Sequence, residues 1–133
     1  MMKLFCLISI LFVFTAKAQT QCERMFDAIE FDNGIIISSE IPAGNISSNP
    51  DIPVITKVDL SGNEIWRIED DIDSFYNLRN INLYNFNDGF IYANLTILDS
   101  HQNSAPNNRI WKIDAVNGNI IWETQIYQTD RKT

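Results

Sequence analysis

Cysteine, histidine and basic residues are scarce in this chain of 133 residues. It contains two cysteines and one histidine, and its 10 Lys and Arg are outnumbered by 17 Asp and Glu, for a formal charge of −7. An acidic chain without a basic cluster repels nucleic acid and anionic membrane surfaces. The sequence therefore predicts no nucleic-acid partner.

Long apolar runs are also missing, except at the start of the chain. The run Leu4–Phe14 follows Lys3 and is shorter than the roughly 20 apolar residues that a spanning helix needs. Residues 16–18 read Ala-Lys-Ala, an A-x-A cleavage site. This order predicts a secretory signal peptide over 1–18, with an uncleaved membrane anchor as the alternative. We expect a secreted or extracytoplasmic protein, in the periplasm or at the cell surface, without a membrane span after cleavage.

Cleavage would leave residues 19–133, enough for one domain. The charge of −7 would become −9, because Lys3 and Lys17 leave with the signal peptide. Of the two cysteines only Cys22 would remain, so a disulfide framework within one mature chain is excluded. A single cysteine in an exported protein is either a free thiol or paired with another molecule. The free thiol is the favoured interpretation.

What the chain does have is an internal repeat. The phrase "ITKVDLSGNEIWR" at 55–67 returns as "IWKIDAVNGNIIWE" at 110–123. Reading backwards from these phrases, further positions recur at nearly the same interval. The paired positions, 55 residues apart except for the last pair at 56, are Phe31 with Phe86, Gly34 with Gly89, Asp59 with Asp114, and Trp66 with Trp122. The sequence therefore predicts two repeats, about 24–70 and about 80–128.

Each repeat reads as four short strands rich in β-branched and aromatic residues. The predicted strands are 25–31, 34–41, 54–59 and 64–68 in the first repeat, and 81–86, 90–98, 109–114 and 120–127 in the second. Asp32-Asn33-Gly34 is a hairpin signal, in which the central residues need positive φ. The only helical candidate after the signal peptide is a short turn within 70–79. The predicted fold class is all-β, with two four-stranded antiparallel blade-like repeats.

The repeated phrase predicts a strand, a tight turn and a returning strand. Asp114 ends the first strand, where its carboxylate can accept hydrogen bonds from backbone N–H groups of the turn. Gly118 supplies a left-handed conformation, and Trp122 lies on one face of the returning strand. Burial of an indole removes about 150–250 Å² from water, worth at most about 4–6 kcal/mol. The first copy has its counterparts at Asp59, Gly62 and Trp66.

Asp114-x-x-Asn117-Gly118-Asn119-x-x-Trp122 resembles the tryptophan-docking turn of the pyrroloquinoline-quinone-type β-propeller repeat. That family's phrase is roughly A-x-D-x-x-T-G-K-x-x-W, so Asn117 and Asn119 stand in place of Thr and Lys. The first phrase, "KVDLSGNEIW", has a turn one residue shorter and resembles the wider class of exported propeller repeats. The resemblance implies a partial β-propeller whose tryptophans pack between neighbouring blades.

The quinone-dependent dehydrogenases of this family bind their cofactor with calcium or a lanthanide, and commonly use a vicinal cysteine pair and a catalytic Asp. This chain has no vicinal cysteine pair, and we identify no counterpart of the metal cluster. Many members of the family are non-catalytic. We therefore expect a non-enzymatic scaffold that binds a protein or a glycan through its loops, with no catalytic, cofactor or metal residues. The alternative is a fragment of a quinone-dependent oxidoreductase.

Propellers use 4–8 blades, so two repeats do not close a ring. Three explanations remain: a fragment of a longer gene product, which is favoured, an assembly of several copies, or a partner that supplies further blades. In each case open sheet edges and an uncovered sheet face invite association. We expect self-association of the isolated chain.

Other candidates for chemistry are isolated residues. His101, in the loop 99–108, is a candidate base or ligand, but no cysteine or second histidine supports it, and a solvated loop histidine is favoured. The acidic run 69–73 is a candidate cation site, but it lacks the order of a calcium loop and is read as a linker. Asn45 begins an N-glycosylation sequon in a predicted loop, and Asn94 begins one in a predicted strand, where we expect no modification.

Overall fold

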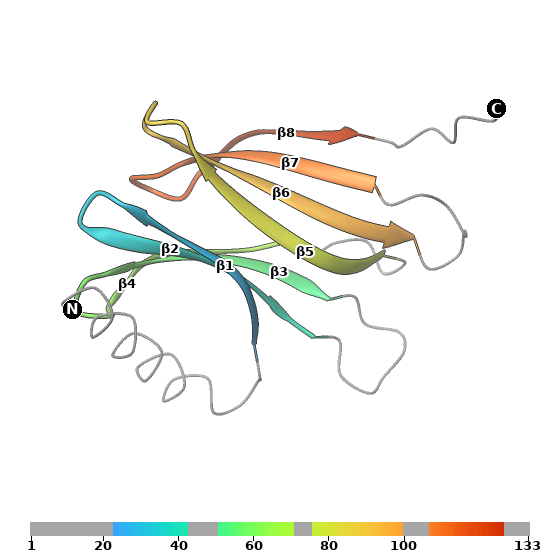
Figure 1. The fold of residues 1–133 in the computed structure, drawn as a ribbon, viewed down its shortest axis with the longest axis horizontal. Coiled ribbons are helices and arrows are strands. Elements are labelled where there is room, and N and C mark those ends of the chain that lie inside the picture. The colour runs from blue at the N-terminus through green and yellow to red at the C-terminus, as the bar shows by residue number, and fades with distance from the viewer. Residues whose placement is uncertain (1–22, 43–50, 71–75, 100–106, 127–133) are drawn as a thin grey trace.

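The computed structural model of the chain describes residues 23–42, 51–70, 76–99 and 107–126. These residues form eight strands and no helix, so the all-β prediction is confirmed. Within these four ranges, no helix is long and apolar enough to cross a membrane. The strands make two four-stranded antiparallel sheets, which lie as two layers (Figure 1). The architecture is consistent with two blade-like units.

Each sheet is a meander, in which every strand pairs with the next one in sequence. Sheet one contains β1 (Arg24–Phe31), β2 (Gly34–Ile41), β3 (Ile52–Asp59) and β4 (Glu64–Glu69). Sheet two contains β5 (Tyr76–Asn85), β6 (Phe90–Asp99), β7 (Asn107–Asp114) and β8 (Ile120–Ile126). All eight predicted strands are present and differ from the prediction by a few residues at their ends. The one larger error is at β5, which already includes residues 76–79, where a helical turn was considered.

The β1–β2 hairpin differs from the prediction in the role of its glycine. The turn residues are Asp32, with φ of 48°, and Asn33, while Gly34 already belongs to β2 and pairs with Phe31. A Cβ at Gly34 would lie 2.6 Å from the carbonyl oxygen of Val58 on β3. Glycine is therefore required by the close approach of two strands and not by a left-handed conformation.

The repeat is present in the strand register, with one correction. Gly34 pairs with Asp59, and the residue that pairs with Asp114 in sheet two is Phe90, not Gly89. Gly89 lies in the β5–β6 turn with φ of 85°. The segment from Phe86 to Phe90 in sheet two is one residue longer than the equivalent segment from Phe31 to Gly34 in sheet one. Equivalent residues of β2 and β6 are therefore 56 positions apart, while those of β3 and β7 are 55 apart. The alignment of Gly34 with Gly89 was therefore wrong.

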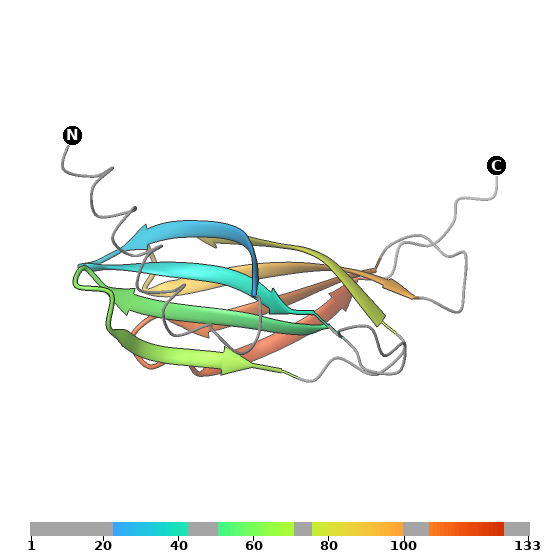
Figure 2. The same cartoon turned by 90° about the horizontal axis from the view of Figure 1, so that it is seen from below.

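The core lies between the two layers. Side chains alternate along a strand, and on β6 every second residue, Ile91, Ala93, Leu95 and Ile97, is buried. Sheet one contributes Ile36, Ile55 and Trp66 to the same cluster. In the views of Figures 1 and 2, β1 and β5 lie side by side and the strands of both sheets run along the same long direction.

Two polar contacts also join the sheets. The hydroxyl of Ser38 on β2 donates to the carbonyl of Ile81 on β5 over 2.9 Å. The carboxylate of Asp27 on β1 accepts the backbone N–H of Leu83 over 2.9 Å. Both contacts satisfy polar groups that burial would otherwise leave without a partner, so they fix how sheet two lies on sheet one.

Candidate functional site

The two repeated turns have nearly the same hydrogen bonds. In the first turn, Asp59 accepts the backbone N–H groups of Ser61 over 2.9 Å and Asn63 over 2.8 Å. The side-chain amide of Asn63 also donates to this carboxylate over 2.9 Å. Hydrogen bonds from the Asn63 side chain and backbone hold the pKa of Asp59 below its usual value. The predicted capping role of this aspartate is confirmed.

In the second turn, Asp114 accepts the backbone N–H groups of Val116 over 2.8 Å and Asn117 over 3.3 Å. Gly118 has φ of 76°, and its counterpart Gly62 has φ of 83°. Both glycines adopt the left-handed conformation that the sequence predicts, and each donates its N–H to the carbonyl of the turn's aspartate.

Trp66 joins sheet one to the second turn. Its indole N–H donates to the carbonyl oxygen of Ala115 over 3.2 Å, and the ammonium group of Lys57 donates to the same oxygen over 2.9 Å. A Cβ at Gly118 would lie 2.8 Å from Cδ2 of the Trp66 ring, so the indole lies directly against this glycine. Trp66 is only 9% exposed. It therefore packs between the two sheets, as the resemblance to propeller repeats implies.

Trp122 does not do the same, and the expectation that it packs between the two sheets of this chain is wrong. Its side chain is 43% exposed. Trp122 pairs with Lys112, as Trp66 pairs with Lys57, so the two indoles have the same position in their sheets. The two sheets stack with their equivalent faces pointing the same way. The face of sheet one that carries Trp66 lies against sheet two, on the side of sheet two that does not carry Trp122. The face that carries Trp122 therefore points away from sheet one.

This relationship extends across all four strands of each sheet. A row of directly paired residues crosses sheet one and lies against sheet two; this docked row is Ile29, Ile36, Lys57 and Trp66. The corresponding row of sheet two lies on its outward face; this exposed row is Tyr84, Tyr92, Lys112 and Trp122. Aromatic residues thus stand in the second sheet where the first has isoleucine.

The exposed row is the candidate site. Tyr84 stacks on Phe86 with 6.4 Å between ring centroids, and Phe86 meets Tyr92 edge-on at 5.2 Å. Tyr92 meets Trp122 edge-on at 6.4 Å, so four aromatic rings form one connected surface, the aromatic face. Phe86 is 66% exposed. A connected apolar surface open to water is typical of an interaction site.

Charged groups border the aromatic face and hold its rings. The ammonium group of Lys112 lies 4.0 Å from the ring centroid of Phe90 and 5.5 Å from that of Tyr92. The hydroxyl of Tyr92 donates to the carboxylate of Asp88 over 2.7 Å. This hydrogen bond holds the pKa of Asp88 below its usual value. The face therefore combines apolar rings with one cation that is available for a hydrogen bond to a ligand.

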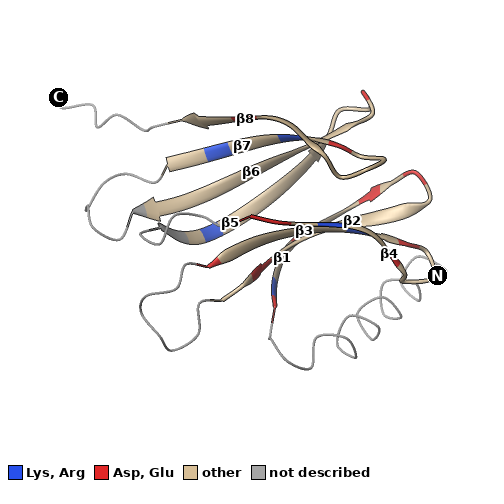
Figure 3. Ribbon diagram, turned by 180° about the vertical axis from the view of Figure 1, so that it is seen from behind, with Lys and Arg blue, Asp and Glu red and all other residues tan. Residues whose placement is uncertain are grey.

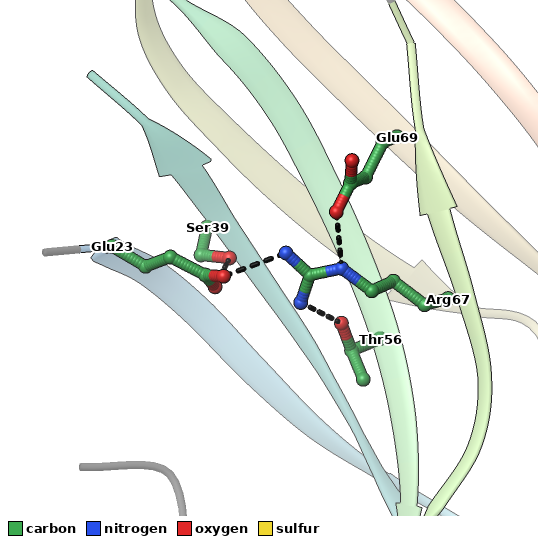
Figure 4. A network of polar contacts seen from close by, with 5 residues as sticks. All are labelled: Glu23, Ser39, Thr56, Arg67 and Glu69. Carbon is green, nitrogen blue, oxygen red and sulfur yellow. Dashed lines mark hydrogen bonds and ion pairs between the residues drawn. The ribbon is translucent and has the colours of Figure 1, made fainter. Parts of the chain in front are cut away.

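The outward face of sheet one carries a polar network instead (Figure 4). Arg67 on β4 forms ion pairs with Glu23 over 2.6 Å and with Glu69 over 2.5 Å, and donates to Thr56 over 3.4 Å. Ser39 donates to the other oxygen of Glu23 over 3.0 Å. Burial opposes the charge of Arg67, but its hydrogen bonds to Glu23 and Glu69 outweigh this effect and raise its pKa. The network ties β4 to the start of β1.

Two features of the site were missed at the level of sequence. Trp111 is fully buried, and its indole N–H donates to the carboxylate of Glu123 over 3.1 Å, so it anchors β7 to β8. The aromatic face was missed because its rings come from three strands, β5, β6 and β8, and from the β5–β6 turn. Part of the signal was present, since the interval of 55 residues aligns Ile29 with Tyr84, whereas it aligns Ile36 with Ile91 and not with Tyr92.

Several predicted residues lie outside the described ranges. These are the signal peptide 1–18, Cys22, the Asn45 sequon, residues 71–73 of the acidic run, and His101. Among the residues that the structure describes, no group of three or more His, Cys, Asp or Glu side chains is placed to hold a metal ion.

Comparison of the sequence with known protein families finds no match, and neither curated proteins nor solved structures match it.

Proposed function

We propose that this chain is a secreted, non-enzymatic repeat module of the β-propeller type that binds a protein ligand through the aromatic face of sheet two. The carrying observation is the connected surface of Tyr84, Phe86, Tyr92 and Trp122 on the outward side of the sheet. Each sheet supports the proposal by its four-stranded meander and its Asp-Gly-Trp turn. Tyrosine and tryptophan are also enriched at the centres of protein interfaces.

A protein ligand is favoured over a glycan by the arrangement of the rings. Tyr92 meets both of its ring neighbours edge-on, at interplanar angles of 67° with Phe86 and 62° with Trp122. The rings therefore form a ridged surface, whereas a sugar ring stacks best on a flat open ring. The Lys112 ammonium can donate a hydrogen bond to a backbone carbonyl, as Lys57 does in the same position of sheet one.

Affinity capture with matched variants tests this function. The chain from Gln19 is immobilised and exposed to extracellular proteins of the producing organism, beside Trp122→Ala and Val116→Asp. Val116 is highly exposed in the second turn and lies outside the aromatic face. We expect one protein to be retained by the wild type and by Val116→Asp, and lost with Trp122→Ala.

Soluble oligosaccharides are tested on the same three proteins by tryptophan fluorescence. Saturable oligosaccharide binding that disappears with Trp122→Ala would show that the ligand is a glycan and not a protein. If all three proteins retain the same amount of ligand in the capture experiment, the aromatic face is not the binding surface.

A further inference from the structure

We infer that the ligand of the aromatic face is a second copy of this chain, whose first turn, residues 59–63, docks on the exposed row. The inference rests on the function proposed above and names its partner. The docking would repeat between two copies what the docked row and the second turn, residues 114–119, already do within one copy.

The donors for this contact are in place. Within one chain, Lys57 and Trp66 both donate to the carbonyl oxygen of Ala115, the residue after the turn's aspartate. Lys112 and Trp122 form the same directly paired couple on the outward face of sheet two. Their counterpart acceptor is the carbonyl of Leu60, the residue after Asp59. The proposed contact is therefore a pair of hydrogen bonds from Lys112 and Trp122 to Leu60 of the second copy.

The acceptor turn is also preformed. In both turns the N–H of the aspartate donates over 2.9 Å to the carbonyl of the asparagine that ends the turn, and a glycine N–H returns to the aspartate carbonyl. Ala115 is 0% exposed because sheet one covers it, whereas Leu60 is 52% exposed. The first turn thus repeats the closing hydrogen bonds of the second in a loop one residue shorter, without the cover that the second receives.

The two turns differ in two respects that limit the contact. Leucine stands at 60 where the second turn has the smaller Ala115, and the first turn is one residue shorter. Ile37 and Val58, on the outward face of sheet one near this turn, are buried in the chain. We therefore place the contact at the exposed turn itself, and not on the sheet surface beside it.

Charge favours this combination of surfaces. The described residues of sheet one and its turns, 23–42 and 51–70, hold ten Asp and Glu against three Lys and Arg, a net −7. Those of sheet two, 76–99 and 107–126, hold four against three, a net −1. Figure 3 shows this difference between the two layers. Lys112 would meet a turn that carries Asp59 and is followed by Glu64, whereas two sheet-one surfaces would repel each other.

The contact is heterologous, because each copy offers one exposed row and one first turn on different surfaces. Such contacts join copies head to tail, into rings or open chains, whereas an isologous contact stops at a dimer. A heterologous contact can therefore be tested with two variants that each remove one of the two surfaces. A copy with a disabled row still has a turn, and a copy with a disabled turn still has a row.

Sedimentation velocity tests the inference on the chain from Gln19. The concentrations cover about 1–100 µM, the range of ordinary protein association. Every protein carries Cys22→Ser, which removes any intermolecular disulfide. Trp122→Ala disables the row. Gly62→Asn disables the turn, because asparagine tolerates the left-handed conformation at φ of 83° and its side chain would occupy the place of the docked indole. Val116→Asp is the surface control.

The expected result is concentration-dependent association of the parent and of Val116→Asp. Trp122→Ala and Gly62→Asn alone should each associate at least about tenfold more weakly, as for loss of an interface hot spot. An equimolar mixture of these two variants should form a 1:1 dimer, because the intact row of one meets the intact turn of the other.

Three results would overturn the inference. If Gly62→Asn associates like the parent while Trp122→Ala does not, the aromatic face binds but the first turn is not its partner, and the proposed function stands. If the parent remains a monomer at 100 µM, or if neither variant weakens association, a second copy is not the ligand. The capture and oligosaccharide experiments then decide the proposed function by themselves.

Discussion

The indole of Trp66 lies against Gly118, which is 52 positions away in the sequence and belongs to the other sheet. A Cβ added to Gly118 would come within 2.8 Å of Cδ2 and 2.9 Å of Cε3 of the ring. Distances below 3.0 Å are essentially never seen for real Cβ contacts. The glycine therefore has two functions, since it allows φ of 76° and leaves room for the indole of the preceding repeat.

The first prediction separates the two repeated tryptophans. Trp66→Ala should lower the free energy of unfolding by about 3–5 kcal/mol, because it removes a large buried side chain. Trp122→Ala should lower it by about 1 kcal/mol or less, since its main ring contact is the edge-on pair with Tyr92. Urea denaturation of both variants in the monomeric concentration range measures the difference. Equal losses would mean that Trp122 is covered in solution.

The second prediction uses two glycines with the same backbone conformation. Gly89 has φ of 85°, close to that of Gly118, but a Cβ at Gly89 would meet nothing within 4 Å. Alanine at either position pays about 1–2 kcal/mol for the left-handed conformation. Gly118→Ala should lose clearly more stability than Gly89→Ala, because the Trp66 ring must also move. The difference between their unfolding free energies, measured in urea, isolates the contact with the indole.

The third prediction concerns export. Expression of the full chain with its leader in a secreting bacterial host should yield an extracytoplasmic product that begins at Gln19, as determined by intact mass. The reason is the order of Lys3, the apolar run Leu4–Phe14 and the cleavage site at 16–18. A membrane-bound product that retains the first residues would show an uncleaved anchor instead.

The strands could be predicted from the sequence because each sheet is a meander of short, β-branched strands joined by strong turn signals. In such a topology every pairing is local, and Asp59 with Gly62 marks one reversal while Asp114 with Gly118 marks another. The error at 76–79 arose because the register of β5 shifts between Leu78 and Asn80, so that the buried residues Leu78 and Ile81 are three positions apart, as on a helix.

The stacking of the sheets could not be predicted with the same success. The repeat suggests that Trp66 and Trp122 are equivalent, and in strand register they are. Whether an equivalent position is buried depends on its neighbour, and only the first sheet has one on that side within the described chain. The same asymmetry places Ile36 in the core and its counterpart Tyr92 on the outward face. Sequence spacing shows that the two positions are equivalent, but it does not show which of the two sheets has a neighbour on that face.

The fourth prediction tests the oxidoreductase alternative. Titration of the chain from Gln19 with pyrroloquinoline quinone and calcium should give no saturable change in absorbance or fluorescence. The reason is that the sequence lacks a vicinal cysteine pair and an identifiable metal cluster. Saturable binding, together with reduction of a dye in the presence of an alcohol, would favour the enzyme fragment.

The last prediction concerns Glu40, whose carboxylate is buried on β2. One oxygen pairs with Arg24 over 2.5 Å, while the other is buried without a hydrogen-bond partner. Burial raises the pKa of Glu40 above 4.5, and the negative charge of Asp51 adds to this effect, while Arg24 opposes it. A carboxyl group whose pKa is higher in the folded than in the unfolded state destabilises the fold when ionised, and this cost disappears as the pH falls through its folded pKa.

Glu40→Gln should therefore raise the free energy of unfolding at pH 7 by about 1 kcal/mol, because burial of a neutral amide costs less than burial of an ionised carboxylate. The advantage should shrink as the pH falls through the raised folded pKa and vanish below the unfolded-state pKa of 4.5, where the wild-type carboxyl is protonated in both states. Urea denaturation of both proteins at several pH values between 4 and 7 measures this difference, in which the other carboxylates cancel. Arg24→Gln is the control and should destabilise the chain most at pH 7, because the ionised Glu40 then loses its cation. A constant difference between Glu40→Gln and the wild type over this range would show that Glu40 is solvated.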